Sequence, residues 1–167
     1  MKTSALILSF SVDRENKKIK VVREFGAPVS KVWAAWTESH ILDQWWAPKP
    51  WQARTRTLDF REGGYWLYAM VGPDGTKIWC RADYKSIIPL KKFSGRDAFC
   101  NEDGKIDDKF PVAFWTVEFS EKPASTLLDI EIAFNELSDL EKYIEMGFKE
   151  GFTAALENLD ALFNSYE

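Results

Sequence analysis

The strongest constraint on this chain is an apolar stripe near its C-terminal end. Between residues 137 and 163 the apolar or small residues that recur at helical spacing are Leu140, Ile144, Phe148, Gly151, Phe152, Ala155, Leu159 and Leu162. This spacing is typical of one face of an amphipathic helix. We predict a single helix from Leu137 to Phe163, with Ser138 as its N-cap and Glu141 completing a capping box. Such a helix would be about 39 Å long and could cross a whole small domain.

Two glycines lie on or beside this stripe, Gly147 and Gly151. A glycine inside a helix is less stable than alanine by about 1 kcal/mol, so each needs a reason. We interpret them as positions where a sheet or a bound molecule comes close to the helix. The expected arrangement is therefore a helix lying across a curved sheet, with a pocket between the two.

Length and composition limit the class of protein. A chain of 167 residues predicts one domain (residues 1–167), in which residues 1–18 form an N-terminal strand extension. The net charge of −4 argues against a general nucleic-acid binder, which would usually carry a basic face. Eight tryptophans and twelve phenylalanines are enough to fill a core and also to line an apolar pocket.

The few cysteine and histidine residues argue against a metal centre. Cys80 and Cys100 are not in a CxxC motif, and with His40 as the single histidine no zinc site of the usual spacing can be built. Reduced thiols predict a cytoplasmic protein. The apolar run within Met1–Val12 is short, so we interpret it as a strand and not as a signal peptide. No stretch is long enough to span a membrane, and no cofactor is expected.

The rest of the chain predicts two short helices and a set of strands. Strands are expected at Leu6–Val12 and Ile19–Phe25; a short helix begins at Pro28, and a second ends at Pro48 and Pro50. From Trp51 onward the apolar period is two, which predicts strands at Ala53–Phe60, Tyr65–Val71, Ile78–Ile88, Lys92–Cys100, Ala113–Phe119 and Thr126–Phe134. The last strand alternates cleanly, which indicates an α+β fold whose antiparallel sheet has one buried face.

Several short motifs carry a resemblance to a known family. They are Phe25-Gly-Ala-Pro28, Gln44-Trp45-Trp46-Ala47-Pro48, Phe60-Arg-Glu-Gly-Gly-Tyr-Trp66, Gly72-Pro-Asp-Gly75 and Gly151-Phe152. With them the chain resembles the START-like (SRPBCC) superfamily, and more closely the family named after the C-terminal domain of the activator of the heat-shock-protein ATPase. The resemblance implies a helix-grip (Bet v 1-like) fold. In it, about six to seven strands wrap around a long C-terminal helix, two short helices follow the first strand, and a deep cavity separates sheet and helix.

Ten residues are candidates for the lining of that cavity. They are Trp46, Trp66, Tyr68, Met70, Tyr84, Asp97, Phe99, Trp115, Phe148 and Phe152. The aromatic members have two interpretations that the sequence leaves open: a solid core, or walls around an apolar ligand. Asp97 shares a strand face with Phe99, so it is either a lone polar group or general base in the cavity, or a surface carboxylate.

Other charged residues predict no catalytic site. His40 is expected on the surface, which leaves no Ser-His or Cys-His pair. Arg81 and Asp83 are expected on the solvent side of their strand, where they could meet Arg96 of the next. The leading hypothesis is therefore a non-enzymatic protein that binds a small hydrophobic or aromatic molecule. The alternatives are a co-chaperone-like module with a chaperone partner, or a cyclase- or hydrolase-type enzyme that uses Asp97 or Tyr84.

Overall fold

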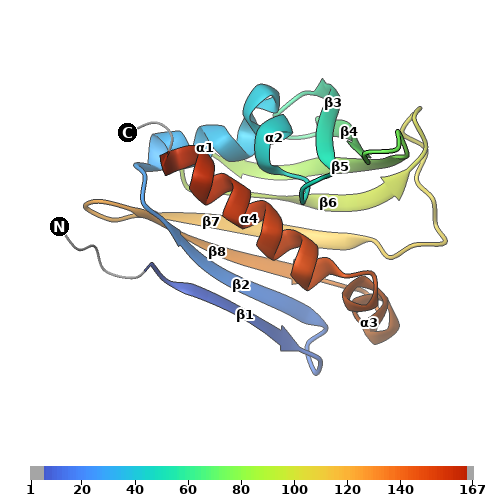
Figure 1. Cartoon of the computed structure of the whole chain (residues 1–167). Helices are drawn as coiled ribbons and strands as arrows, with labels where there is room; N and C mark the ends of the chain where they lie inside the picture. The colour runs from blue at the N-terminus through green and yellow to red at the C-terminus, as the bar shows by residue number, and fades with distance from the viewer. Residues whose placement is uncertain (1–5, 165–167) are drawn as a thin grey trace.

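The computed structural model describes residues 6–164 and shows one large sheet crossed by a helix (Figure 1). The strands are β1 Leu8–Asp13, β2 Lys18–Phe25, β3 Gln52–Leu58, β4 Tyr65–Val71, β5 Lys77–Ile88, β6 Lys92–Cys100, β7 Ala113–Glu121 and β8 Thr126–Ala133. The helices are α1 Val29–Thr37, α2 Ser39–Trp45, α3 Leu137–Glu145 and α4 Phe148–Asn164. The strands are antiparallel to their neighbours in the order β1-β2-β8-β7-β6-β5-β4-β3. The predicted α+β helix-grip fold is confirmed.

Two details of the expected topology differ. The sheet has eight strands and not six or seven, and the two short helices follow the second strand and not the first. Both differences have the same cause, because β1 pairs with β2 as a hairpin, with Leu8 opposite Arg23, and extends the sheet by one strand. Residues 1–5 lie outside the described part of the chain, so the expectation for Met1–Val12 is tested only from Leu6 onward.

Helix α4 closes the buried face of the sheet. The side chains that it buries are Phe152, Ala155, Leu156, Leu159 and Phe163. Phe163 meets Phe25 of β2 edge to face at 5.7 Å between ring centroids. An ion pair between Arg23 and Asp160 connects the same strand to the helix. At the far edge of the sheet, the Asp43 carboxylate of α2 accepts hydrogen bonds from the backbone N–H (2.9 Å) and hydroxyl (2.7 Å) of Thr55 in β3.

The prediction of one continuous C-terminal helix is wrong. The chain turns between α3 and α4 at Gly147, whose φ of 90° lies in the left-handed region that favours glycine. The predicted capping box is also absent. The N-cap of α3 is Glu136, which makes no side-chain capping hydrogen bond, so Ser138 lies inside the helix. Glu141 is instead paired with the Arg14 guanidinium at 3.0 Å.

Neither glycine marks a close approach of the sheet. A Cβ atom added at Gly147 would meet nothing within 4 Å, so this glycine is explained by its backbone conformation. A Cβ atom at Gly151 would lie 3.8 Å from Pro48 Cγ, which is ordinary van der Waals contact. The expectation that a sheet comes close to these positions is therefore wrong, whereas the alternative, that a bound molecule does so, stays a prediction.

Candidate functional site

A cavity of about 330 Å³ lies between the sheet and the two C-terminal helices. Its lining residues come from the segment after α2, strands β4 to β7, the loop before β7, and helices α3 and α4 with the bend between them. They are Trp46, Pro48, Trp51, Tyr68, Met70, Ile78, Cys80, Asp97, Ala98, Phe99, Pro111, Trp115, Tyr143, Met146, Gly147, Phe148, Gly151 and Phe152. Because the helix bends at Gly147, both Tyr143 of α3 and Phe148 of α4 reach the same space.

Eight of the ten candidate residues line this cavity. They are Trp46, Tyr68, Met70, Asp97, Phe99, Trp115, Phe148 and Phe152. The other two, Trp66 and Tyr84, line a second and much smaller space of about 40 Å³. Trp46, Asp97 and Trp115 line both spaces and separate them. Whether any of these residues contacts a ligand stays a prediction.

Several lining residues were not among the candidates. They are Pro48, Trp51, Ile78, Cys80, Ala98, Pro111, Tyr143, Met146, Gly147 and Gly151. Cys80 could have been found, because alternation on β5 places it on the same face as Tyr84. Tyr143 could not, because on a straight helix it lies beside the apolar stripe, and only the bend at Gly147 brings it to the cavity.

The rings around the cavity form a connected set. Phe148 and Phe152 stack at 5.1 Å between centroids, and the Trp115 ring meets Phe152 edge to face at 5.4 Å. Tyr143 lies 4.7 Å from Phe148. On the opposite wall the Trp46 indole Nε1 donates a 3.0 Å hydrogen bond to the Tyr68 hydroxyl, which fixes the orientation of both. The walls are therefore mostly rigid aromatic surface.

Asp97 is the lone carboxylate among the lining residues. Its residue is half-buried, but its Oδ1 atom is shut off from solvent and has no hydrogen-bond partner in the described part of the chain. Burial raises the pKa of Asp97 to about 7, and the nearby backbone N–H of Ala98 offsets only part of this effect. Asp97 therefore lines the cavity, and its role there as a polar anchor or general base stays a prediction.

The other titratable groups of the cavity are weak acids. Burial raises the pKa of the Tyr68 and Tyr143 hydroxyls and of the Cys80 thiol well above their usual ranges, and the charge of Asp97 adds to each shift. All three groups are therefore neutral at pH 7. Neither lysine nor arginine is among the residues that line this cavity. Asp97 thus has no positive partner there.

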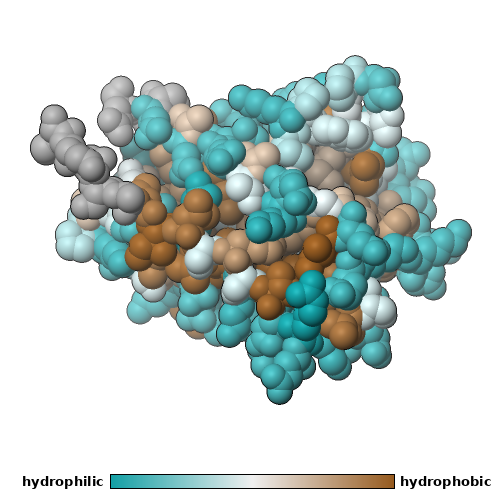
Figure 2. Space-filling model, turned by 60° about the horizontal axis from the view of Figure 1, so that its bottom comes forward, coloured by the Kyte–Doolittle hydropathy of each residue, from teal (hydrophilic) through white to brown (hydrophobic). Residues whose placement is uncertain are grey.

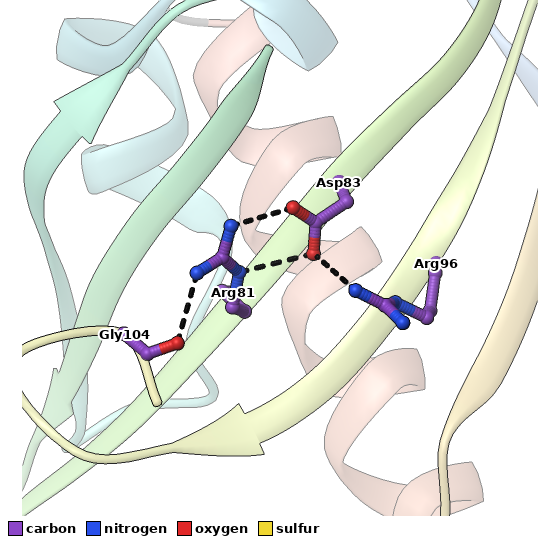
Figure 3. Close-up of polar contacts among 4 residues, drawn as sticks. All are labelled: Arg81, Asp83, Arg96 and Gly104. Carbon is purple, nitrogen blue, oxygen red and sulfur yellow. Dashed lines mark hydrogen bonds and ion pairs between the residues drawn. The ribbon is translucent and has the colours of Figure 1, made fainter. Parts of the chain in front are cut away.

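The charged residues of β5 lie on the other face of the sheet (Figure 3). Arg81 donates two hydrogen bonds to Asp83, at 3.0 and 2.6 Å, and one to the backbone oxygen of Gly104 at 2.8 Å. Arg96 of β6 adds a 3.3 Å contact to Asp83. Arg81 and Asp83 are half-buried and Arg96 is exposed, and their contacts act as a cross-strand support that carries a net charge of about +1.

Apolar surface outside the cavity is divided. On the face in Figure 2, hydrophobic residues form patches separated by hydrophilic ones. Leu6, Ile7 and Leu8 form one exposed apolar run, whereas apolar side chains exposed singly elsewhere are normal on a surface. The exposed His40 lies 3.7 Å from Glu38 and has no nucleophile as partner among the described residues. Within residues 6–164 there is no group of three or more His, Cys, Asp or Glu side chains that could hold a metal. No helix in this range is long and apolar enough to cross a membrane.

Comparisons with solved structures agree with the fold. A protein from Arthrobacter aurescens is 33% identical, with a TM-score of 0.89 over 94% of this chain and 91% of that one. Ms6760 from Mycobacterium smegmatis is 25% identical, with a TM-score of 0.88 over 98% of this chain and 100% of that one. A protein from Staphylococcus epidermidis is also 25% identical, with a TM-score of 0.81 over 94% and 95%. These names state no activity.

A comparison with curated proteins found no match. The model of one protein family matches residues 26–164, which include α1 to α4 and all strands from β3 to β8. The family is described as "Activator of Hsp90 ATPase homolog 1-like protein". The match spans most of this chain, and the helix-grip fold agrees with that of the solved structures above. This chain therefore belongs to the Activator of Hsp90 ATPase homolog 1-like family of the START-like superfamily.

Proposed function

We propose that this protein binds a small hydrophobic or aromatic molecule in the cavity between the sheet and helices α3 and α4. The observation that carries the proposal is a space of about 330 Å³ with aromatic walls and one carboxylate, whose Oδ1 atom has no hydrogen-bond partner among the described residues. Small-molecule sites are typically concave, mostly apolar and supplied with few polar groups, and they occupy roughly 300–1,000 Å³. This cavity lies at the lower end of that range, which favours a ligand of one to three rings.

Binding can be tested with the neutral apolar dye N-phenyl-1-naphthylamine, followed by its own emission. Met146 lines the cavity and is 43% exposed, so Met146→Trp should narrow the entrance without disturbing the core. The matched control is Ile88→Trp, because Ile88 is 52% exposed and does not line the cavity. We expect saturable binding to the parent, weaker binding to Met146→Trp and unchanged binding to the control. If the parent shows no saturable binding and carries no co-purified small molecule in native mass spectrometry, the proposal is wrong.

A second candidate is proton transfer by Asp97. It is favoured by one observation, namely that a carboxyl group facing the cavity has a pKa of about 7, as a general base at neutral pH requires. Tyr84 suits this role less, since burial raises its pKa further and it lines the smaller space. In an enzyme, Asp97→Asn should abolish turnover of a bound compound and retain its binding. The co-chaperone alternative rests on the family description alone.

A further inference from the structure

The polar groups of the cavity are unbalanced in charge. Asp97 supplies an acceptor, and no lysine or arginine lines this cavity, although Arg96 lines the smaller space that Asp97 also borders. The titratable groups that interact with Asp97 are the neutral acids Tyr68, Cys80, Tyr84, Cys100 and Tyr143, together with the Asp83 carboxylate, whose negative charge raises the pKa of Asp97 further. A carboxylate oxygen that is shut off from solvent and accepts no hydrogen bond is unfavourable, and a cation that enters the cavity would remove this penalty.

The walls favour a cation for a second, independent reason. The π faces of Trp, Tyr and Phe rings carry negative potential and attract ammonium groups within about 6 Å of the ring centroid. Trp115, Tyr143 and Phe148 supply such rings from three different elements, β7, α3 and α4. Their centroid distances of 5.9 Å (Trp115 to Phe148) and 4.7 Å (Tyr143 to Phe148) show that the rings pack against one another, and all three line the cavity. An anion in this space would meet the same rings and Asp97 as repulsive groups.

We propose that the ligand is an amine that is protonated at neutral pH, with its ammonium group directed at Asp97 and an aromatic or other apolar body among the rings. The inference rests on the proposed function, since it names the chemical class of the molecule that the cavity binds. The buried Trp115 Nε1 also has no hydrogen-bond partner among the described residues. It could donate a hydrogen bond to a hydroxyl or ether oxygen of the same molecule.

The pH dependence of binding follows from this assignment. In the empty cavity the pKa of Asp97 is about 7, so the carboxylate that an ammonium group needs is the minor form below that pH. Affinity for an amine should therefore decrease about tenfold per pH unit below 7 and level off above it. A neutral ligand that accepts a hydrogen bond from the protonated carboxyl would show the opposite trend.

The test uses three probes of one shape, 2-naphthylmethylamine, 2-naphthylmethanol and 2-naphthoate, titrated calorimetrically into the full chain at pH 8. We expect the amine to bind at least about tenfold more tightly than the alcohol, and the carboxylate to bind more weakly than the alcohol. Asp97→Asn should remove the preference for the amine and leave the affinity for the alcohol within about twofold. Glu118→Gln, which removes an exposed carboxylate from β7, is the control for net charge and should change neither.

The possible outcomes separate this inference from the proposed function. If alcohol and amine bind equally and Asp97→Asn changes neither, the amine assignment is wrong while small-molecule binding stands. If none of the probes binds, and N-phenyl-1-naphthylamine does not bind either, both fail. If Asp97→Asn does not fold, the inference is tested by measuring the affinity of the parent protein for the amine from pH 5 to pH 8. An affinity for the amine that does not decrease below pH 7 overturns the inference.

Discussion

The same substitution made at two glycines four residues apart should change stability in opposite directions. Gly147 has a φ of 90°, where an L-residue is less stable by about 1–2 kcal/mol, and a new Cβ would gain no contact within 4 Å. Gly151 lies inside α4, where alanine is more stable by about 1 kcal/mol. Its new Cβ would lie at an ordinary contact distance of 3.8 Å from Pro48 Cγ.

Thermal unfolding monitored by circular dichroism measures both variants. For a chain of this length, 1 kcal/mol corresponds to about 2–4 °C in Tm. Gly147→Ala should therefore lower Tm by about 2–8 °C, and Gly151→Ala should raise it by about 2–4 °C. If Gly147→Ala melts at the parent temperature, α3 and α4 can form one continuous helix. If Gly151→Ala melts lower than the parent, the space beside Pro48 is tighter than the 3.8 Å contact indicates.

Three further changes test the core, the cavity and the connection of α4 to the sheet. Phe148→Ala at the cavity wall should lower the free energy of unfolding by about 1–2 kcal/mol. Phe25→Ala in the closed core should lower it by about 3–5 kcal/mol, and urea unfolding of both variants measures the difference. The carboxyl of Asp97 binds its proton more tightly in the folded protein (pKa about 7) than in the unfolded chain (about 3.9), so parent stability falls as pH rises through this window. The stability of Asp97→Asn relative to the parent should therefore rise by about 1–3 kcal/mol between pH 5 and pH 8; an equal value at both would show that Asp97 is solvated. Asp160→Ala leaves the buried Arg23 without its ion-pair partner and should destabilise by about 3–5 kcal/mol at pH 7, and a loss below 1 kcal/mol would mean that water replaces the carboxylate.

The sheet could be predicted well because its signal is local. Alternation along residues 126–134 and the Gly72 to Gly75 turn are read from a few neighbouring residues, and both are present in the structure. The C-terminal helix shows the limit of such patterns. An apolar stripe continues through residues 137–163 whether or not the backbone turns, so periodicity could not show that Gly147 has a positive φ.

The candidate site was predicted in part for the same reason. Tyr68 and Met70 alternate on one strand, and the buried face of that strand is also the cavity wall. Trp66 shares this alternation but lines the smaller space, because position along a strand decides which space a side chain reaches and alternation decides only the face. The lack of a hydrogen-bond partner for Asp97 Oδ1 depends on residues from several elements, and no motif in the sequence predicts it.

The bend at Gly147 also assigns two tasks to different residues: packing against the sheet and bordering the cavity. Beyond the bend, Leu156 and Leu159 are almost fully buried, so changes there destabilise the whole fold. At the bend, Met146 borders the cavity and is 43% exposed, so its size can change with little loss of stability. Substitutions at the α3–α4 junction of this chain should therefore change the shape of the cavity mouth, while the helix that holds the sheet stays the same.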